Sequence, residues 1–209
     1  MKLSGSGTYT GDTVISAGSV LVADSSSGSS RMLGQNTGEV KIGVAGPALV
    51  IERSQNITID NVISGDGGVK AKLNGAVLTL TGANTFKGET VVTGGTLEVT
   101  DRSVNGLVES VGTLGLGNVR LDNTQMRFVL NSPTARLLVP NDIRGVADLV
   151  KTGAGTVELL GTVSLDASTS EGGSLGKVEV TSGELVLASK GRPALEKLSR
   201  LEINGGTVK

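Results

Sequence analysis

The sequence predicts an all-β fold in which short strands stack into a coil. First, the stretch Leu78–Val99 (LTLTGANTFKGETVVTGGTLEV) holds three short β-type runs separated by turns containing Gly and Asn. Its apolar residues fall at alternating positions within the runs: Leu78, Leu80, Val91, Leu97 and Val99. Second, a relative of this stretch occurs at Leu3–Val22. Third, the 209-residue chain has 32 Gly, two Phe, one Tyr and no Trp. An interior built from Val, Leu, Ile and Ala suits narrow, regularly layered β-structure.

The internal repeat is specific. Leu3–Val22 aligns without gaps on Leu80–Val99, an offset of 77 residues, and places Tyr9 opposite Phe86. The identical positions of the first copy are Leu3, Gly5, Thr8, Gly11, Thr13, Val14, Gly18 and Val22. Ile143–Gly161 parallels Ile63–Gly82 with one residue of slippage. A Gly-Gly-Thr-Leu-type corner recurs at residues 17–20, 94–97, 182–185 and 205–208.

These repeats predict one continuous β-helix segment over residues 1–209, with copies near 3–22, 57–99 and 143–187 and a partial copy at 201–209. Short strands with frequent corners cannot bury a face alone, but stacked coils bury a continuous aliphatic interior. Repeats of roughly 20–25 residues give about eight to ten coils. An antiparallel sandwich and a β-propeller are the alternatives, since Asn-Gly hairpin signals occur at Asn74, Asn105 and Asn204. Propeller blades usually carry aromatic residues, which are scarce here.

Several irregular segments interrupt the pattern. Asp24–Gly38 is a polar Ser/Gly tract and is predicted to be a surface excursion. Thr100–Gly112 and Lys190–Arg200 could each hold a short helix. Asn131–Pro140 contains Pro133 and Pro140 and is predicted to be a loop or an edge segment. Such excursions on a rigid scaffold are places where a partner could bind.

The composition excludes several kinds of active site. The chain has no His and no Cys, so a Ser–His–Asp triad, an HExxH zinc site and thiol chemistry are absent. Ser174 lies in a GxSxG match, but no His partner exists. Gly65-Asp66-Gly67-Gly68 resembles one unit of a calcium-binding tandem repeat, yet it stands alone and is better interpreted as a turn. We therefore predict no catalytic residue, no cofactor and no metal.

The charge and hydropathy of the chain bear on its partners, and its acidic residues bear on catalysis. The net charge is −1, with basic and acidic residues mixed along the chain, so no nucleic-acid partner is expected. No apolar run reaches the roughly 20 residues needed to span a bilayer, so no direct membrane insertion is expected. Glu52, Asp60 and Asp66 are the nearest candidates for the paired acids of a carbohydrate-active β-helix, the alternative that the sequence favours least.

The motifs resemble a known repeat. LTLTGANTFKGETVVTGGTLEV, LVKTGAGTVELLG at Leu149–Gly161 and NITIDNVISGDGG at Asn56–Gly68 are similar to the passenger-associated transport repeat of bacterial autotransporters. The resemblance implies a right-handed parallel β-helix that is exported through the periplasm and the outer membrane to the cell surface. It also implies a C-terminal outer-membrane β-barrel as partner in the full-length protein. The chain lacks a signal peptide and breaks off within a repeat, so we expect a fragment of a longer passenger.

The sequence thus favours a structural spine that supports folding-driven secretion and surface display of an adhesin or virulence factor. The alternative is a surface, carried on the loops, that binds a host or bacterial surface protein. The residues predicted to set the repeat structure lie at corners or in the core: Gly5, Gly11, Gly18, Gly82, Asn84, Gly88, Gly94, Gly95, Leu97, Gly183, Gly205 and Gly206. Asn84 and Asn204 are also candidates for hydrogen-bonded ladders between coils.

Overall fold

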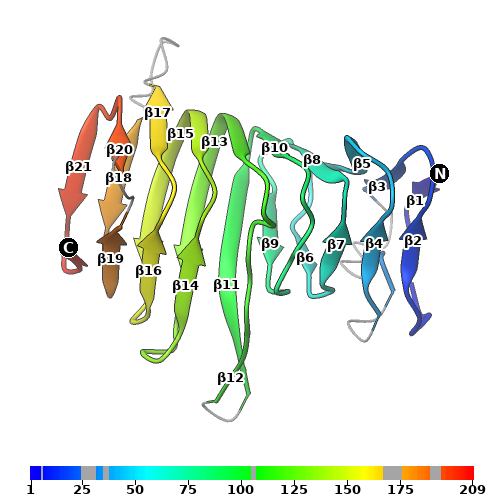
Figure 1. The fold of residues 1–209 in the computed structure, drawn as a ribbon, viewed down its shortest axis with the longest axis horizontal. Coiled ribbons are helices and arrows are strands. Elements are labelled where there is room, and N and C mark those ends of the chain that lie inside the picture. Colours follow the sequence, from blue (N-terminus) through cyan, green and yellow to red (C-terminus); the bar gives the residue numbers. More distant parts are fainter. Residues whose placement is uncertain (6, 25–31, 35–37, 105–106, 167–175, 189–193) are drawn as a thin grey trace.

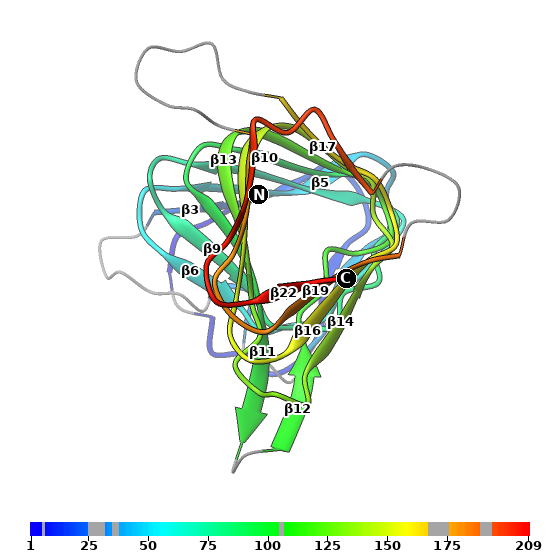
Figure 2. The same ribbon diagram turned by 90° about the vertical axis from the view of Figure 1, so that its left-hand side faces the viewer.

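The computed structural model is a parallel β-helix, as the sequence predicted. It describes residues 1–5, 7–24, 32–34, 38–104, 107–166, 176–188 and 194–209. The strands lie side by side along the long axis of the molecule, with the N-terminus at one end and the C-terminus at the other (Figure 1). Viewed along that axis, the chain winds around a single interior with three sides (Figure 2). We call these sides face 1, face 2 and face 3.

Face 1 is the longest ladder. Its neighbouring strands pair in parallel. They are β1 (Lys2–Leu3), β3 (Val20–Ala23), β5 (Pro47–Arg53), β8 (Gly68–Leu73), β10 (Thr90–Thr93), the first part of β13 (Val119–Val129), the first part of β15 (Ile143–Thr152), β17 (Val163–Asp166) and β20 (Leu195–Glu196). These nine described strands define eight turns of the coil, within the predicted range. A turn takes from 19 residues, Lys2 to Leu21, up to 32 residues, Val163 to Leu195.

Face 2 is a second parallel ladder. It is made of β6 (Ile57–Ile59), β9 (Val77–Leu80), β11 (Thr96–Val104), the second parts of β13 and β15, β18 (Lys177–Val180) and β21 (Arg200–Ile203). Because β13 and β15 continue from face 1 into face 2, these coils turn that corner without leaving the sheet.

Face 3 consists of two parallel sheets with hydrogen-bonded turns between them. The first sheet contains β2 (Thr13–Ile15), β4 (Val40–Ile42) and β7 (Ile63–Gly65). The second contains β14 (Arg136–Val139), β16 (Thr156–Leu159), β19 (Glu184–Leu187) and β22 (Thr207–Val208). Between them, the amide of Thr85 donates to the carbonyl of Ile63, and the amide of Leu116 donates to that of Phe86.

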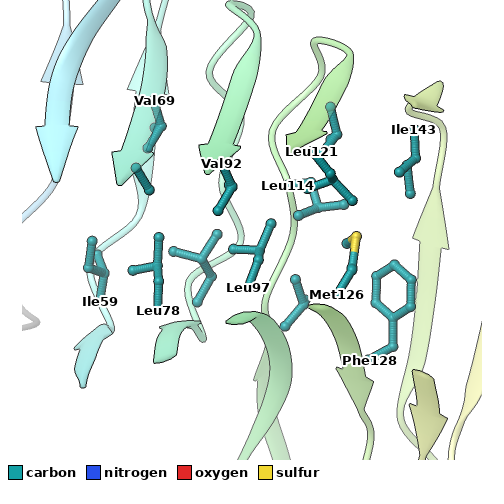
Figure 3. Packing of buried hydrophobic residues seen from close by; sticks show 14 of the residues in the cluster. Ile59, Val69, Leu78, Val92, Leu97, Leu114, Leu121, Met126, Phe128 and Ile143 are labelled. Atoms are coloured by element: carbon teal, nitrogen blue, oxygen red, sulfur yellow. The ribbon is translucent and has the colours of Figure 1, made fainter. Parts of the chain in front are cut away.

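The interior is aliphatic and aligned from coil to coil (Figure 3). One column, which we call the Leu97 column, runs through face 2 in strict register: Ile57, Leu78, Leu97, Met126, Leu149, Val178 and Leu201. All except Leu201 are at most 2% exposed. Burying one such side chain contributes roughly 1.5–3 kcal/mol, so the column contributes a large share of the stability. Leu201 lies in the last coil and is 44% exposed.

One apolar position differs from the prediction. Val91 is only 9% exposed, but it pairs in register with the exposed Lys70 and Arg120 and therefore lies on the outer side of face 1. Val92 pairs with the buried Ala71 and fills the interior instead. In the run Thr90–Thr93 a polar residue, Thr90, also points inward, so simple alternation of apolar residues did not reveal the register.

The irregular segments also differ in part from expectation. Residues 101–104 of β11 pair antiparallel with β12 (Leu107–Val111), so the described residues of Thr100–Gly112 form two hairpin strands that project from the coil and not a helix (Figure 2). In Lys190–Arg200, the described residues hold the short strand β20, and residues 190–193 lie outside the described chain. Asn131–Pro140 contains β14, the edge strand of its sheet, as the two prolines suggested. In Asp24–Gly38, Met32 and Leu33 are buried, and residues 25–31 and 35–37 lie outside the described chain.

Candidate functional site

The corners where successive coils meet form the candidate site. Three glycines of the second repeat copy lie against the backbone of the preceding coil. A Cβ atom on Gly82 would stand 2.4 Å from the carbonyl oxygen of Asn61. At Gly88 it would stand 2.4 Å from the amide nitrogen of Gly68, and at Gly95 2.4 Å from the carbonyl oxygen of Ala76. Real Cβ atoms do not approach so closely, so these coils stack only because no side chain is present.

The equivalent glycines of the first copy have different surroundings. Gly5, Gly11 and Gly18 correspond to Gly82, Gly88 and Gly95, yet a Cβ atom on any of them would meet nothing within 4 Å. The glycines of the second copy contact the coil that precedes their own, whereas Gly5, Gly11 and Gly18 belong to the first coil of the structure. The contact is therefore a property of stacking and not of the local turn.

The remaining predicted glycines follow the second-copy pattern. A Cβ atom on Gly94 would stand 2.6 Å from the carbonyl oxygen of Leu73, and on Gly183 2.3 Å from that of Gly153. On Gly205 it would stand 3.0 Å from the carbonyl oxygen of Thr181, and on Gly206 2.3 Å from the side chain of Val180. Each of these partners lies about one coil earlier.

Asn84 links three successive coils. Its Oδ1 accepts a hydrogen bond from the amide of Ile63 at 2.8 Å, and its Nδ2 donates to the carbonyl of Thr113 at 2.7 Å. The Thr113 hydroxyl donates back to the carbonyl of Asn84 at 2.6 Å. Asn84 is 3% exposed, so these bonds replace water for buried backbone groups. Its amide therefore bonds to backbone and not to another Asn. Asn204 donates to Glu179 at an exposed position.

Two further asparagines act in a similar way and were missed from the sequence. The Nδ2 of Asn61 donates to the carbonyl of Gly38, and that of Asn141 donates to the carbonyls of Gly115 and Gly117. The available signal was the shared pattern Asn-x-apolar-x-Gly, which occurs at Asn61–Gly65 and again at Asn84–Gly88.

Tyr9 and Phe86 pack at equivalent corners, as their repeat positions suggested. The Phe86 ring lies against Gly115, and the Tyr9 ring lies against Gly34. Phe86 is fully buried, whereas Tyr9 is 41% exposed and its hydroxyl hydrogen-bonds to Thr13. In both cases an aromatic ring covers a glycine of the next coil.

Two buried cations were not predicted. Lys151 is inside the coil, and its Nζ donates to the carbonyls of Thr152, Gly153 and Ser182 at 2.8–3.2 Å. Burial lowers the pKa of Lys151 to about 8. Arg53 is also buried, donates to the carbonyl of Ala23 and lies 3.3 Å from a carboxylate oxygen of Asp24. Both cations satisfy carbonyls at a bend of the chain.

The acids considered for carbohydrate chemistry lie apart along the chain, and two of them, Asp60 and Asp66, have structural partners. Asp60 accepts a hydrogen bond from the Thr81 hydroxyl. Asp66 pairs with Lys87, whose pKa is raised by this bond. Glu52 lies on the exposed side of β5. Within the described residues, no group of three or more His, Cys, Asp or Glu side chains could hold a metal ion. Ser174 lies outside the described residues.

Comparison with known proteins agrees with this geometry. The profile of a family described as Passenger-associated-transport-repeat matches residues 1–22 and 71–99. The adhesin BmaC autotransporter of Brucella suis biovar 1 (strain 1330) is 38% identical over 76 residues, which is 36% of this chain and 2% of the relative. No solved structure gave a significant match. In the described part of the chain, no helix is long and apolar enough to cross a membrane.

The matches define the class of the chain. Residues 1–22 and 71–99 carry passenger-associated transport repeats, and the predicted resemblance to an autotransporter passenger is confirmed. A passenger of this class is exported to the bacterial cell surface, which is the location that the two matches support for this chain. The matched stretch spans only 2% of the relative's length.

Proposed function

We propose that this chain is a rigid spine segment of an autotransporter passenger, in which stacking of coils supports export and surface display. The carrying observation is the contact of Gly82, Gly88 and Gly95 with the backbone of the preceding coil. A coil can close only against a neighbour that is already in place or forms with it, so stability depends on nearest-neighbour interfaces. Coils that fold outside the cell and cannot easily unfold would bias translocation outward.

In the full-length protein, the segment would be delivered by its own C-terminal outer-membrane β-barrel. We propose no catalytic role for the segment, because the corner residues carry no side chain suited to catalysis and two of the candidate acids, Asp60 and Asp66, have structural partners. The relative is named an adhesin, and a spine that presents an adhesive region fits that name.

The test is the substitution Gly95→Val in the full-length protein that contains this segment. We expect reduced surface display and reduced resistance to protease, because the side chain would overlap Ala76 and Leu73 of the preceding coil. Gly18→Val is the matched control, since the equivalent corner has open space around it. Display and protease resistance that stay unchanged in Gly95→Val would refute the proposal.

A second candidate function rests on the β11–β12 hairpin. It stands out from the coil, and Leu107 near its end is 75% exposed (Figure 1). A projecting hairpin is suited to contact a host or bacterial surface protein. Replacing residues 102–110 by a short Gly/Ser linker should abolish cell binding and leave the β-type circular dichroism intact. Asn131–Pro140 is not a suitable deletion for this purpose, because Leu137 and Val139 belong to the core.

A further inference from the structure

The outer surface of face 1 carries a column of basic residues beside a shallow hollow. In register across β8, β10, β13 and β15, the outward residues are Lys70, Val91, Arg120 and Arg144. The hollow measures about 310 Å³, and its lining includes Pro47, Lys70, Glu89, Val91 and Arg120. Lys70 and Arg120 thus flank a small apolar floor formed by Pro47 and by Val91, which is 9% exposed, and Arg144 lies beside Arg120 in the next strand.

The charge of this hollow is positive and local. Within the described residues, Glu89 is the acid that forms ion pairs with the two arginines: its Oε1 lies 3.2 Å from Nη2 of Arg144, and its Oε2 lies 3.9 Å from Nε of Arg120. Lys70 makes no ion pair within the described part of the chain. Three cations and the single carboxylate of Glu89 leave a surplus of two positive charges.

The surplus does not extend along the strands. Two residues further on, the outward column contains charges of both signs: Glu52, Lys72, Asp122 and Asp166. Its three carboxylates outnumber the single Lys72, so this second column is net negative. An anionic ligand would therefore be attracted to the hollow and not to face 1 as a whole.

The sheet itself restricts the kind of ligand. Strands β8, β10, β13 and β15 are each paired on both sides in this region, so no free strand edge could bind an extended peptide. Recognition must come from side chains on successive coils, which are spaced by about 4.8 Å. Guanidinium groups bind carboxylates and sulfates through paired N–H donors, and a small apolar floor suits the C–H face of a sugar ring.

We infer that this hollow binds an acidic polysaccharide, with Arg120, Arg144 and Lys70 contacting its carboxylate or sulfate groups and Val91 contacting a ring. The site is separate from the corners that stack the coils, so it is independent of the proposed spine role. Glu89 restrains the two arginines and also limits the affinity by competing with the ligand.

The experiment measures binding of the 209-residue chain to three polymers: heparin (sulfated), polygalacturonate (carboxylated only) and dextran (neutral). We expect binding to at least one acidic polymer and not to dextran, with weaker binding at high salt because exposed charges are screened. The double variant Arg120→Gln/Arg144→Gln should bind about tenfold more weakly or worse. Binding to heparin alone would assign the site to sulfate, and binding to both acidic polymers would assign it to either anionic group.

The matched control is Lys41→Gln/Arg136→Gln, which removes the same charge from two exposed, ion-paired residues on face 3. It should bind like the unmodified chain. Glu89→Gln should bind more tightly, an effect that a purely structural role would not produce. Equal losses in the two double variants, equal binding to dextran, no binding to either acidic polymer, or a folded Glu89→Gln variant that binds no more tightly would each overturn the inference.

Discussion

Alanine at Gly95 and alanine at Gly18 should have unequal effects, although the two positions are equivalent in the repeat. Both glycines have left-handed backbone, with φ of +59° and +67°. In either case alanine adopts this conformation at a cost of about 1–2 kcal/mol, partly offset by about 0.4–1 kcal/mol from the less flexible unfolded chain. Only Gly95 has close neighbours: its Cβ atom would lie 2.4 Å from the oxygen of Ala76 and 2.6 Å from Cβ of Leu73.

Overlap of this kind typically costs a further 1–3 kcal/mol, because the neighbours are backbone and a Cβ atom and cannot rotate away. We therefore expect Gly18→Ala to lower the free energy of unfolding by about 1 kcal/mol and Gly95→Ala by about 2–4 kcal/mol. The assay is equilibrium unfolding in guanidinium chloride, followed by far-ultraviolet circular dichroism. Midpoints are compared between variants whose transitions have the same slope.

A second pair of glycines tests the contact between coils without the effect of a left-handed backbone. Neither Gly11 nor Gly88 has a positive φ, and only Gly88 lies against the preceding coil, where an added Cβ atom would stand 2.4 Å from the amide nitrogen of Gly68. Gly11→Ala should be nearly neutral, whereas Gly88→Ala should cost about 1–3 kcal/mol. Equal losses within each pair would show that the corner glycines act through local conformation, and the stacking argument would then be wrong.

Three further outcomes follow from the buried polar groups. Because the pKa of Lys151 falls from its usual 10.5 to about 8 on folding, the unfolded chain binds more protons between these values. The unfolding free energy should therefore rise with pH from about 8 to 10.5, by up to about 3 kcal/mol. Denaturant titrations at several pH values measure this rise. The variant Lys151→Met should abolish it, and the control Lys72→Met, at an exposed position, should keep it. Asn84→Ala should cost about 2–4 kcal/mol in the same unfolding assay, since two buried backbone groups lose their partners, while Asn204→Ala should stay within about 0.5 kcal/mol. Asp101 accepts the amides of the two residues after Leu130, so Asp101→Ala should lower the thermal midpoint more than replacing the hairpin residues 102–110.

Much of the architecture could be predicted because the same pattern of strands and turns occurs more than once in the sequence. The repeat at Leu3–Val22 and Leu80–Val99 identified the stacked unit, and alternation correctly identified Leu78, Leu80, Leu97 and Val99 as core. Val91 is also buried, at 9% exposed, but it lies on the outer side of its strand, and the inward positions are taken by Thr90 and Val92. A buried threonine carries no apolar signal, so the register there depends on the neighbouring strands.

The candidate site was predictable only in outline. The positions of the corner glycines were evident, but the distinction between Gly18 and Gly95 depends on what lies one coil away. The buried cations Lys151 and Arg53 were missed because a charged residue in a strand normally indicates an exposed position. Their partners are carbonyls at chain bends, which only the folded coil brings together.

The three pairs of repeat-equivalent glycines separate local from intercoil requirements within one molecule. A turn that needed glycine for its own conformation would need it equally in both copies. Gly5 and Gly82, by contrast, share a sequence context, and only Gly82 is confined by a neighbouring coil. The repeat therefore encodes an interface between coils in addition to the left-handed turn conformation that Gly18 and Gly95 share, and each coil stabilises the chain chiefly through the coils next to it. A substitution at Gly88, near the middle of the stack, should consequently weaken the link between the two ends without unfolding either one. Amide hydrogen exchange that accelerates evenly across all coils in Gly88→Ala would contradict this nearest-neighbour description.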